Sequence, residues 1–352
     1  MSSELASTAK AMVAPGKGIL AADESTGTAN KRFAALGIPQ TEEMRQKYRD
    51  MLLTAPDFAS YISGVILYDE TIRQNALSGK SFVDLLHGSG SLPGIKLDTG
   101  PHPLALGLPD EKVTEGLDGL AERVEEYVKL GAKFAKWRAV ITIDASRGLP
   151  SDACLRVNAH ALARYAAICQ AGGLVPIVEP EVVMDGGAAQ TLEQSFDVHE
   201  RALRHTFEEL AAQNVTFEEM VLKPSMVIPG QKSGATASVN EVASQTLAVL
   251  LRWVPAAVAG IAFLSGGQSD EEATAHLNEI NVLAPLHPAP WSLTFSYGRA
   301  LQAPALNRWL GNEANVADAQ NELHHRMRMN SLAARGKWTP ALEREKTLVL
   351  SH

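Results

Sequence analysis

Cysteine is scarce in this sequence, which has only Cys154 and Cys169 among its 352 residues. Both fall in segments with a helical pattern, so the disulfide framework of small secreted domains is excluded, and we expect both to be small, buried packing residues in a reducing compartment. No apolar run is long enough to cross a bilayer, and residues 1–8 lack the basic end and apolar run of a secretory signal. We therefore predict a cytoplasmic protein that does not contact membranes.

The sequence also lacks a net positive charge. The formal net charge is -8, with 45% hydrophobic and 20% charged residues. This composition is that of a soluble globular protein and opposes broad attraction to nucleic acid or to an anionic membrane, so any phosphate binding must be local. The ten histidines show neither the HxH nor the HExxH spacing of a metal site, and we expect His324 and His325 to lie on a solvated helix face.

Short apolar runs alternate with amphipathic helical patterns along the chain, which indicates a parallel α/β sheet. Because eight is the strand number of the TIM barrel, we predict a single (β/α)8 barrel over residues 1–340, followed by a tail at 341–352. A doubly wound open sheet is the alternative, since strand number does not prove closure. The eight runs cover residues 18–22, 64–68, 94–97, 134–137, 174–178, 220–223, 260–264 and 291–295.

Charged or phosphate-compatible residues appear where seven of these eight runs end. In a barrel of parallel strands, all these ends lie on one face, where such enzymes build their active sites. The second run ends at Asp69 and Glu70, to which we assign no role. The other seven are followed by Asp23 and Ser25, Lys96 and Asp98, Lys136 and Arg138, Glu179 and Glu181, Lys223, Ser265 to Gly267, and Ser296 to Arg299.

Lys223 has almost purely apolar neighbours, in the segment Met-Val-Leu-Lys-Pro-Ser-Met-Val-Ile at 220–228. Burial and a nearby cation such as Lys136 would both lower its pKa, which would make the amine a nucleophile at neutral pH. The alternative is a strand-end lysine that reaches solvent, and the following Pro224 is compatible with it.

Three carboxylates are candidates for proton transfer. Glu179 and Glu181 follow an apolar strand and could supply a general acid or base, with a solvated loop as the alternative. Asp23 could be a general base, although the segment Asp-Glu-Ser-Thr-Gly favours a helix cap, because Asp, Ser and Thr all form caps.

Two glycine-containing turns, at residues 265–269 and 296–299, follow the seventh and eighth runs. This is the usual phosphate site of the barrel fold, because glycine lets backbone N–H groups approach the phosphate oxygens. Arg299 could bind two of those oxygens at once. A Gly-Gly turn alone would be weak evidence, since turns commonly contain it.

Six segments, at residues 14–27, 134–138, 177–181, 221–224, 263–269 and 293–302, resemble class I (Schiff-base) fructose-1,6-bisphosphate aldolases, in a similarity that runs from about 11 to 336. The resemblance implies cleavage to dihydroxyacetone phosphate and glyceraldehyde 3-phosphate without metal or other cofactor, in a homotetramer. It implies that Lys223 is the nucleophile, Glu179 the acid/base supported by Lys136 and Glu181, and Asp23 the base for the C4 hydroxyl. The C1 phosphate would contact Ser265, Gly266, Gly298 and Arg299, and the C6 phosphate Ser25, Arg32, Lys96 and Arg138. Ser296 would also bind the substrate.

The sequence departs from the resembled family at its end. Members from animals and chloroplasts end in a tyrosine thought to assist proton exchange, whereas this chain ends Leu-Val-Leu-Ser-His. We expect a group inside the barrel or ordered water to take that role, and Glu343, Glu345 and His352 to be solvated.

Three other functions would also fit part of the pattern: another imine-forming barrel enzyme of the transaldolase or deoxyribose-phosphate type, a pyridoxal-phosphate enzyme, and a non-catalytic scaffold. The paired phosphate-binding segments favour a bisphosphate substrate over that of the first alternative. A pyridoxal-phosphate enzyme would leave a chromophore on borohydride reduction without added sugar, and a scaffold would gain nothing from ionisable groups clustered on one face.

Overall fold

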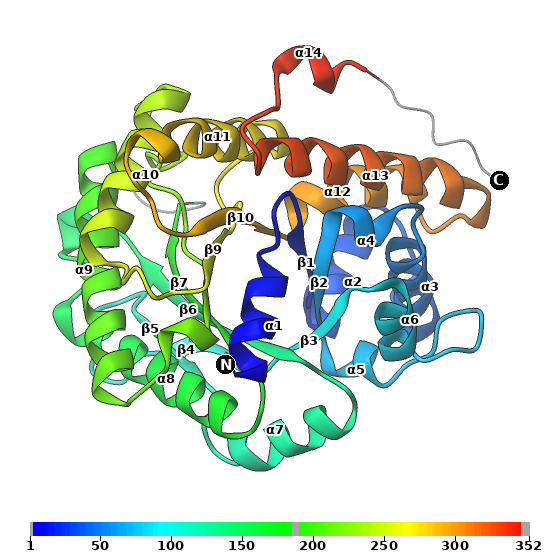
Figure 1. Ribbon diagram of the computed structural model, residues 1–352, viewed down its shortest axis with the longest axis horizontal. Helices are drawn as coiled ribbons and strands as arrows, with labels where there is room; N and C mark the ends of the chain where they lie inside the picture. The colour runs from blue at the N-terminus through cyan, green and yellow to red at the C-terminus, as the bar shows by residue number, and fades with distance from the viewer. Residues whose placement is uncertain (1–2, 185–189, 346–352) are drawn as a thin grey trace.

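Eight parallel strands close into a barrel in the computed structural model, which describes residues 3–184 and 190–345 (Figure 1). Closure confirms the predicted (β/α)8 barrel and excludes the open sheet. Around the barrel the strand order is β1-β10-β9-β8-β7-β6-β3-β2. The strands are β1 (Gly18–Ala22), β2 (Ile62–Leu67), β3 (Leu92–Lys96), β6 (Phe134–Thr142), β7 (Val175–Val183), β8 (Val221–Leu222), β9 (Gly260–Phe263) and β10 (Ser292–Tyr297).

Each of the eight predicted runs overlaps a strand, and β6 and β7 extend farthest beyond their runs. β6 continues to Thr142 and β7 continues to Val183, and the two pair in register along their whole length. Arg138, Glu179 and Glu181 therefore lie inside strands rather than beyond their ends. Strand β8 is short, so Lys223 follows it directly.

Helices surround the barrel (Figure 1), and several begin where the sequence provides a side-chain cap. Ser269 and Glu272 form a capping box at the start of α11. The helices are α1 (Glu4–Met12), α2 (Thr26–Ala35), α3 (Glu42–Leu53), α4 (Phe58–Tyr61), α5 (Asp69–Ile72), α6 (Phe82–Ser89), α7 (Leu120–Lys129), α8 (Asp152–Ala171), α9 (Leu192–Ala212), α10 (Val239–Trp253), α11 (Asp270–Leu283), α12 (Arg299–Trp309), α13 (Val316–Ala333) and α14 (Pro340–Glu343).

Helix α1 closes the amino-terminal end of the barrel, in front of the strands in Figure 1. Met12 and Val13 join an apolar cluster with inward-facing barrel residues such as Phe134. The fit is close, because a Cβ on Gly94 would lie 2.3 Å from the Phe134 ring. This end is therefore filled by side chains, and the carboxyl ends of the strands are left to form a site.

A two-stranded antiparallel ribbon, β4 (Gly100–Pro103) and β5 (Lys112–Glu115), follows β3 and was not expected from the sequence. Its strands are short and contain two prolines, which removes the signal of a normal strand. The ribbon contributes Gly100 and Pro101 to the wall of the pocket described below.

Two expectations about the carboxyl-terminal region were wrong. His324 is only 4% exposed, because its ring packs against Tyr61. Glu343 is not solvated, since its carboxylate accepts hydrogen bonds from Arg326 at 2.6 Å and from the Trp338 ring at 2.9 Å. The predicted boundary between 340 and 341 falls inside α14, and His352 lies outside the described residues.

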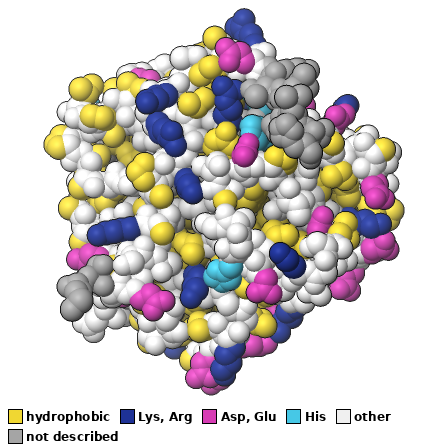
Figure 2. Space-filling view, turned by 45° about the vertical axis from the view of Figure 1, so that its right-hand side comes forward, with side chains coloured by type: hydrophobic (Ala, Val, Ile, Leu, Met, Phe, Trp, Pro, Cys, Tyr) yellow, Lys and Arg dark blue, Asp and Glu magenta, His cyan; other side chains and the backbone are white. Residues whose placement is uncertain are grey.

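The described residues contain no helix that is both long and apolar enough to span a membrane. On the face shown in Figure 2, lysine and arginine side chains stand singly or in small groups rather than in a continuous stripe. Cys154 and Cys169 are both buried, as predicted.

Candidate active site

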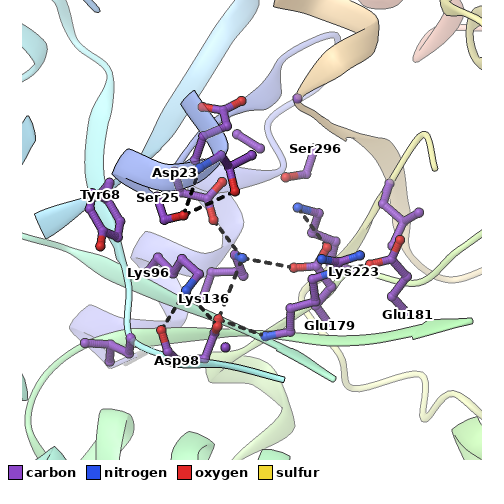
Figure 3. A pocket seen from close by; sticks show the side chains of 18 of the residues that line it. Asp23, Ser25, Tyr68, Lys96, Asp98, Lys136, Glu179, Glu181, Lys223 and Ser296 are labelled. Carbon is purple, nitrogen blue, oxygen red and sulfur yellow. Dashed lines mark hydrogen bonds and ion pairs between the residues drawn. The ribbon is translucent and has the colours of Figure 1, made fainter. Parts of the chain in front are cut away.

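A pocket of about 890 Å³ opens at the carboxyl ends of the barrel strands (Figure 3). Every residue that the sequence proposed for the site lines this pocket, although these residues lie in or after seven different strands. They are Asp23, Ser25, Arg32, Lys96, Lys136, Arg138, Glu179, Glu181, Lys223, Ser265, Gly266, Ser296, Gly298 and Arg299.

Lys223 lies inside the pocket wall and is 4% exposed. Its backbone N–H donates to the oxygen of Val178 at 2.8 Å, which fixes the residue against β7. Its Nζ lies 3.1 Å from Oε1 of Glu179. The alternative of a strand-end lysine that reaches solvent is therefore wrong, and the amine instead has a carboxylate as its partner.

Lys136 differs from Lys223 in the number of its carboxylate partners. Its Nζ lies 2.7 Å from Asp23, 3.6 Å from Glu179 and 3.8 Å from Asp98. Burial alone would lower the pKa of Lys136, but the three carboxylates outweigh burial and raise it. Lys136 therefore stays an ammonium, which suits it to stabilise negative charge rather than to attack a carbonyl.

Asp23 directly follows β1 and points toward Lys136 (Figure 3). Burial would raise the pKa of Asp23, but the charges of Lys136 and Lys223 outweigh it and hold the pKa at about 2. The helix cap at this point is Ser25, whose hydroxyl accepts a hydrogen bond from the Thr28 N–H. Asp23 is therefore not the cap and remains an ionised carboxylate in the pocket.

Glu179 and Glu181 lie two residues apart on β7, so both project into the pocket. Glu181 pairs with the guanidinium of Arg138, and this pairing, together with other carboxylates, outweighs burial and raises the pKa of Arg138. Oε2 of Glu179 and the hydroxyl of Ser296 are buried without a hydrogen-bond partner among the described residues. Both polar atoms are at positions where they could meet polar groups of a ligand.

The candidate phosphate contacts lie on two sides of the lysines. Ser25 and Lys96 are on one side of Lys136 in Figure 3, and Ser296 is on the other side, near Lys223. The turn at 265–267 requires glycine, because Gly267 has a φ of +80° and an added Cβ would lie 2.6 Å from Met184.

Two carboxylates, Asp98 and Glu24, form ion pairs in the site, although the sequence analysis assigned them no role. Oδ1 of Asp98 lies 2.8 Å from Lys96, so Asp98 stands between the two lysines of β3 and β6. The sequence feature that could have identified Asp98 is its position two residues after Lys96. Glu24 pairs with Arg32 and Arg49, and no local pattern indicates those partners. Asp69 and Glu70, which follow the second apolar run and were given no role, separate in the structure. Asp69 lines the pocket, and Glu70 pairs with Arg45 outside it.

The fold and this cluster define a class of protein. It is a (β/α)8 barrel with a buried, carboxylate-paired lysine at the carboxyl ends of its strands, which is the arrangement that an imine-forming enzyme needs. No group of three or more histidine, cysteine, aspartate or glutamate side chains within residues 3–184 and 190–345 is arranged to hold a metal ion.

Comparison with known proteins narrows this class. The family described as "Fructose-bisphosphate aldolase class-I" matches residues 4–349. A protein from Xanthomonas axonopodis pv. citri, named "Probable fructose-bisphosphate aldolase class 1", is 54% identical over 336 residues, which are 95% of this chain and 98% of the relative. The fructose-bisphosphate aldolase of Dictyostelium discoideum is 48% identical and covers 96% of this chain and 93% of its own.

Among solved structures, a ternary complex of the Plasmodium falciparum fructose-bisphosphate aldolase with TRAP and an inhibitor matches with a TM-score of 0.92 and 48% identity, over 96% of this chain and 95% of that chain. This chain belongs to the class I fructose-bisphosphate aldolase family.

Proposed function

We propose that this protein cleaves fructose 1,6-bisphosphate reversibly to dihydroxyacetone phosphate and glyceraldehyde 3-phosphate through a Schiff base on Lys223. The observation that carries the proposal is the pairing of a buried Lys223 amine with Glu179 at 3.1 Å, in a pocket with candidate phosphate contacts on two sides. The experiment that tests it is turnover of fructose 1,6-bisphosphate by the purified protein.

The first step forms the imine. Lys223 passes a proton to Glu179 and its uncharged amine attacks C2 of the ketose. A nitrogen–carbon bond forms, and a proton moves from that nitrogen to the carbonyl oxygen. Glu179 then protonates the hydroxyl of the resulting carbinolamine, so that it leaves as water and a protonated imine remains. Support comes from Oε2 of Glu179, since this oxygen is buried, forms no hydrogen bond among the described residues and lies 3.6 Å from the Lys136 ammonium.

The second step breaks the C3–C4 bond. Asp23 takes the proton of the C4 hydroxyl, the C4 oxygen becomes the aldehyde oxygen, and the bonding electrons move into the imine to give an enamine. Glyceraldehyde 3-phosphate then leaves. Protonation of the enamine carbon and hydrolysis release dihydroxyacetone phosphate. The position of Asp23, 2.7 Å from the Lys136 ammonium, supports this role, because Lys136 keeps the base ionised.

Arg299→Ala is expected to weaken binding of dihydroxyacetone phosphate at least tenfold. Arg299 is the first residue of α12 and lines the pocket beside Gly298. A charge-assisted contact to an ionised group is worth roughly 1.5–3 kcal/mol. Unphosphorylated dihydroxyacetone should lose little affinity, and equal weakening of both ligands would indicate damage to the fold instead.

Chelation is expected to leave the cleavage rate unchanged, because the imine itself accepts the electron pair and the proposed steps use no Lewis acid. The measurement is turnover of fructose 1,6-bisphosphate after prolonged dialysis against a chelator. A loss of rate that zinc restores would contradict the proposal, since a metal would then polarise the carbonyl.

The homotetramer and the cytoplasmic location are proposed from the resemblance to the family, which acts on sugar phosphates. Sedimentation of the purified protein tests the first, because a monomer of 37.7 kDa and a tetramer are well separated in mass. Fractionation of the source cells tests the second.

A further inference from the structure

Glu24 is a buried carboxylate directly after Asp23, and its side chain is only 7% exposed. It accepts hydrogen bonds from three separate helices. Nη1 of Arg32 in α2 donates to Oε1 at 2.6 Å, and Nη2 of Arg49 in α3 donates to Oε2 at 2.8 Å. The amide of Gln302 in α12 donates to Oε1 at 3.0 Å. The position of this carboxylate is therefore fixed from three directions.

The partners of Glu24 are themselves held in place. The Gln302 amide also donates to the oxygen of Ala21, and its own oxygen accepts from the Tyr48 hydroxyl at 2.9 Å. The guanidinium of Arg49 stacks on the Tyr48 ring, 5.5 Å from its centroid. Burial would raise the pKa of Glu24, but Arg49 and Arg32 outweigh it and lower the pKa. Glu24 therefore stays ionised, and proton transfer is not its task.

The two arginines differ in what they face. The side chain of Arg49 is 4% exposed and does not line the pocket. Arg32 is 27% exposed and does line it, beside Ser25 and Thr28 at the start of α2. Within the described part of the chain, only Nη1 of Arg32 forms a hydrogen bond. One nitrogen of Arg32 is thus anchored, and its other donors remain for a ligand.

We infer that Glu24 is a positioning residue that holds Arg32 for the phosphate farther from the Schiff base, and so sets the preference for a bisphosphate over a monophosphate sugar. The inference rests on the proposed function, in which Arg32 contacts the C6 phosphate. A guanidinium fixed at one nitrogen loses less conformational freedom when it binds phosphate than a free side chain does.

Anchoring of Arg32 favours phosphate binding, but the negative charge of Glu24 opposes it, because a carboxylate repels phosphate and partly neutralises Arg32. A single Glu24→Gln variant would mix the two effects and would also leave Arg49 buried without its anion. The double variant Glu24→Gln with Arg49→Met removes one negative and one positive charge. The net charge around Arg32 is then unchanged, and its anchor is weakened from a carboxylate to a neutral amide.

The experiment compares kcat/KM for fructose 1,6-bisphosphate with kcat/KM for fructose 1-phosphate. In the double variant, this ratio should fall at least tenfold relative to the wild type. The matched control is Glu70→Gln with Arg45→Met, which removes a partly buried ion pair of α3, at 2.6 Å, outside the pocket. The control should keep the wild-type ratio within twofold.

A raised ratio, an equal loss with both sugars, or the same fall in the control would overturn the inference. If the double variant does not fold, Glu24→Asp replaces it, because this variant keeps the charge for Arg49 but withdraws the carboxylate from Arg32 by about 1.5 Å. A wild-type ratio in that variant would also overturn the inference. Failure of the wild-type protein to cleave the bisphosphate would instead reject the proposed function, before any variant is compared.

Discussion

Lys223→Arg should abolish cleavage of fructose 1,6-bisphosphate, with kcat reduced by roughly 10⁴-fold or more, the scale on which loss of a catalytic nucleophile acts. Arginine keeps a positive charge beside Glu179, 3.1 Å from the lysine nitrogen, so the buried carboxylate retains a partner. A guanidinium stays protonated in proteins and cannot attack a carbonyl. The variant therefore separates the nucleophile from the ion pair.

Two quantities are measured, the rate of cleavage and the covalent trapping of the Schiff base. Borohydride added with dihydroxyacetone phosphate should inactivate the wild-type protein and add the mass of the reduced ligand to the peptide that contains Lys223. The control Lys129→Arg, at an exposed position in α7, should be trapped like the wild type. Modification of Lys136 or Lys96 would overturn the assignment. Lys136 is the weaker candidate, because three carboxylates raise its pKa.

The positions of the strands could be predicted because each contains an apolar run, but the ends of β6 and β7 could not. Arg138 and Glu179 interrupt the apolar pattern, and an interrupted pattern resembles the end of a strand. In the structure these two residues pair in register across β6 and β7. The side chains that face the pocket thus made the strands appear shorter than they are, a local conflict that is expected at functional sites.

The grouping of site residues at strand ends could be predicted from the sequence, whereas the hydrogen-bond and packing partners of individual residues could not. The rule that parallel strands end on one face sufficed to bring Lys136 and Lys223 together. The environment of Glu24 depends on Gln302, which is 278 positions away, and only barrel closure makes that contact. His324 was assigned to solvent from a polar helix pattern, because packing against Tyr61 has no local signal.

Asp23→Asn should lower the rate of cleavage by about 10² to 10⁴-fold, the usual contribution of a general base. Asparagine keeps the size of the side chain but cannot take the C4 hydroxyl proton. Formation of the Schiff base with dihydroxyacetone phosphate should persist, because this ligand has no C4 hydroxyl and the pair of Lys223 and Glu179 is unchanged. Cleavage and borohydride trapping are therefore expected to separate in this variant.

The pKa of Asp23 also fixes how this variant should respond to pH. Because the folded state lowers the pKa from 3.8 to about 2, ionised Asp23 stabilises the fold above pH 3.8, and this contribution is lost as the pH falls through about 2. The difference in free energy of unfolding between wild type and Asp23→Asn should therefore shrink as the pH falls from 4 to about 2.

The matched control for cleavage and trapping is Asp197→Asn, at an exposed position in α9, which should change neither the cleavage rate nor borohydride trapping. Wild-type cleavage by Asp23→Asn would remove Asp23 as the base, and equal loss of cleavage and trapping would show that it holds the site together rather than transferring a proton.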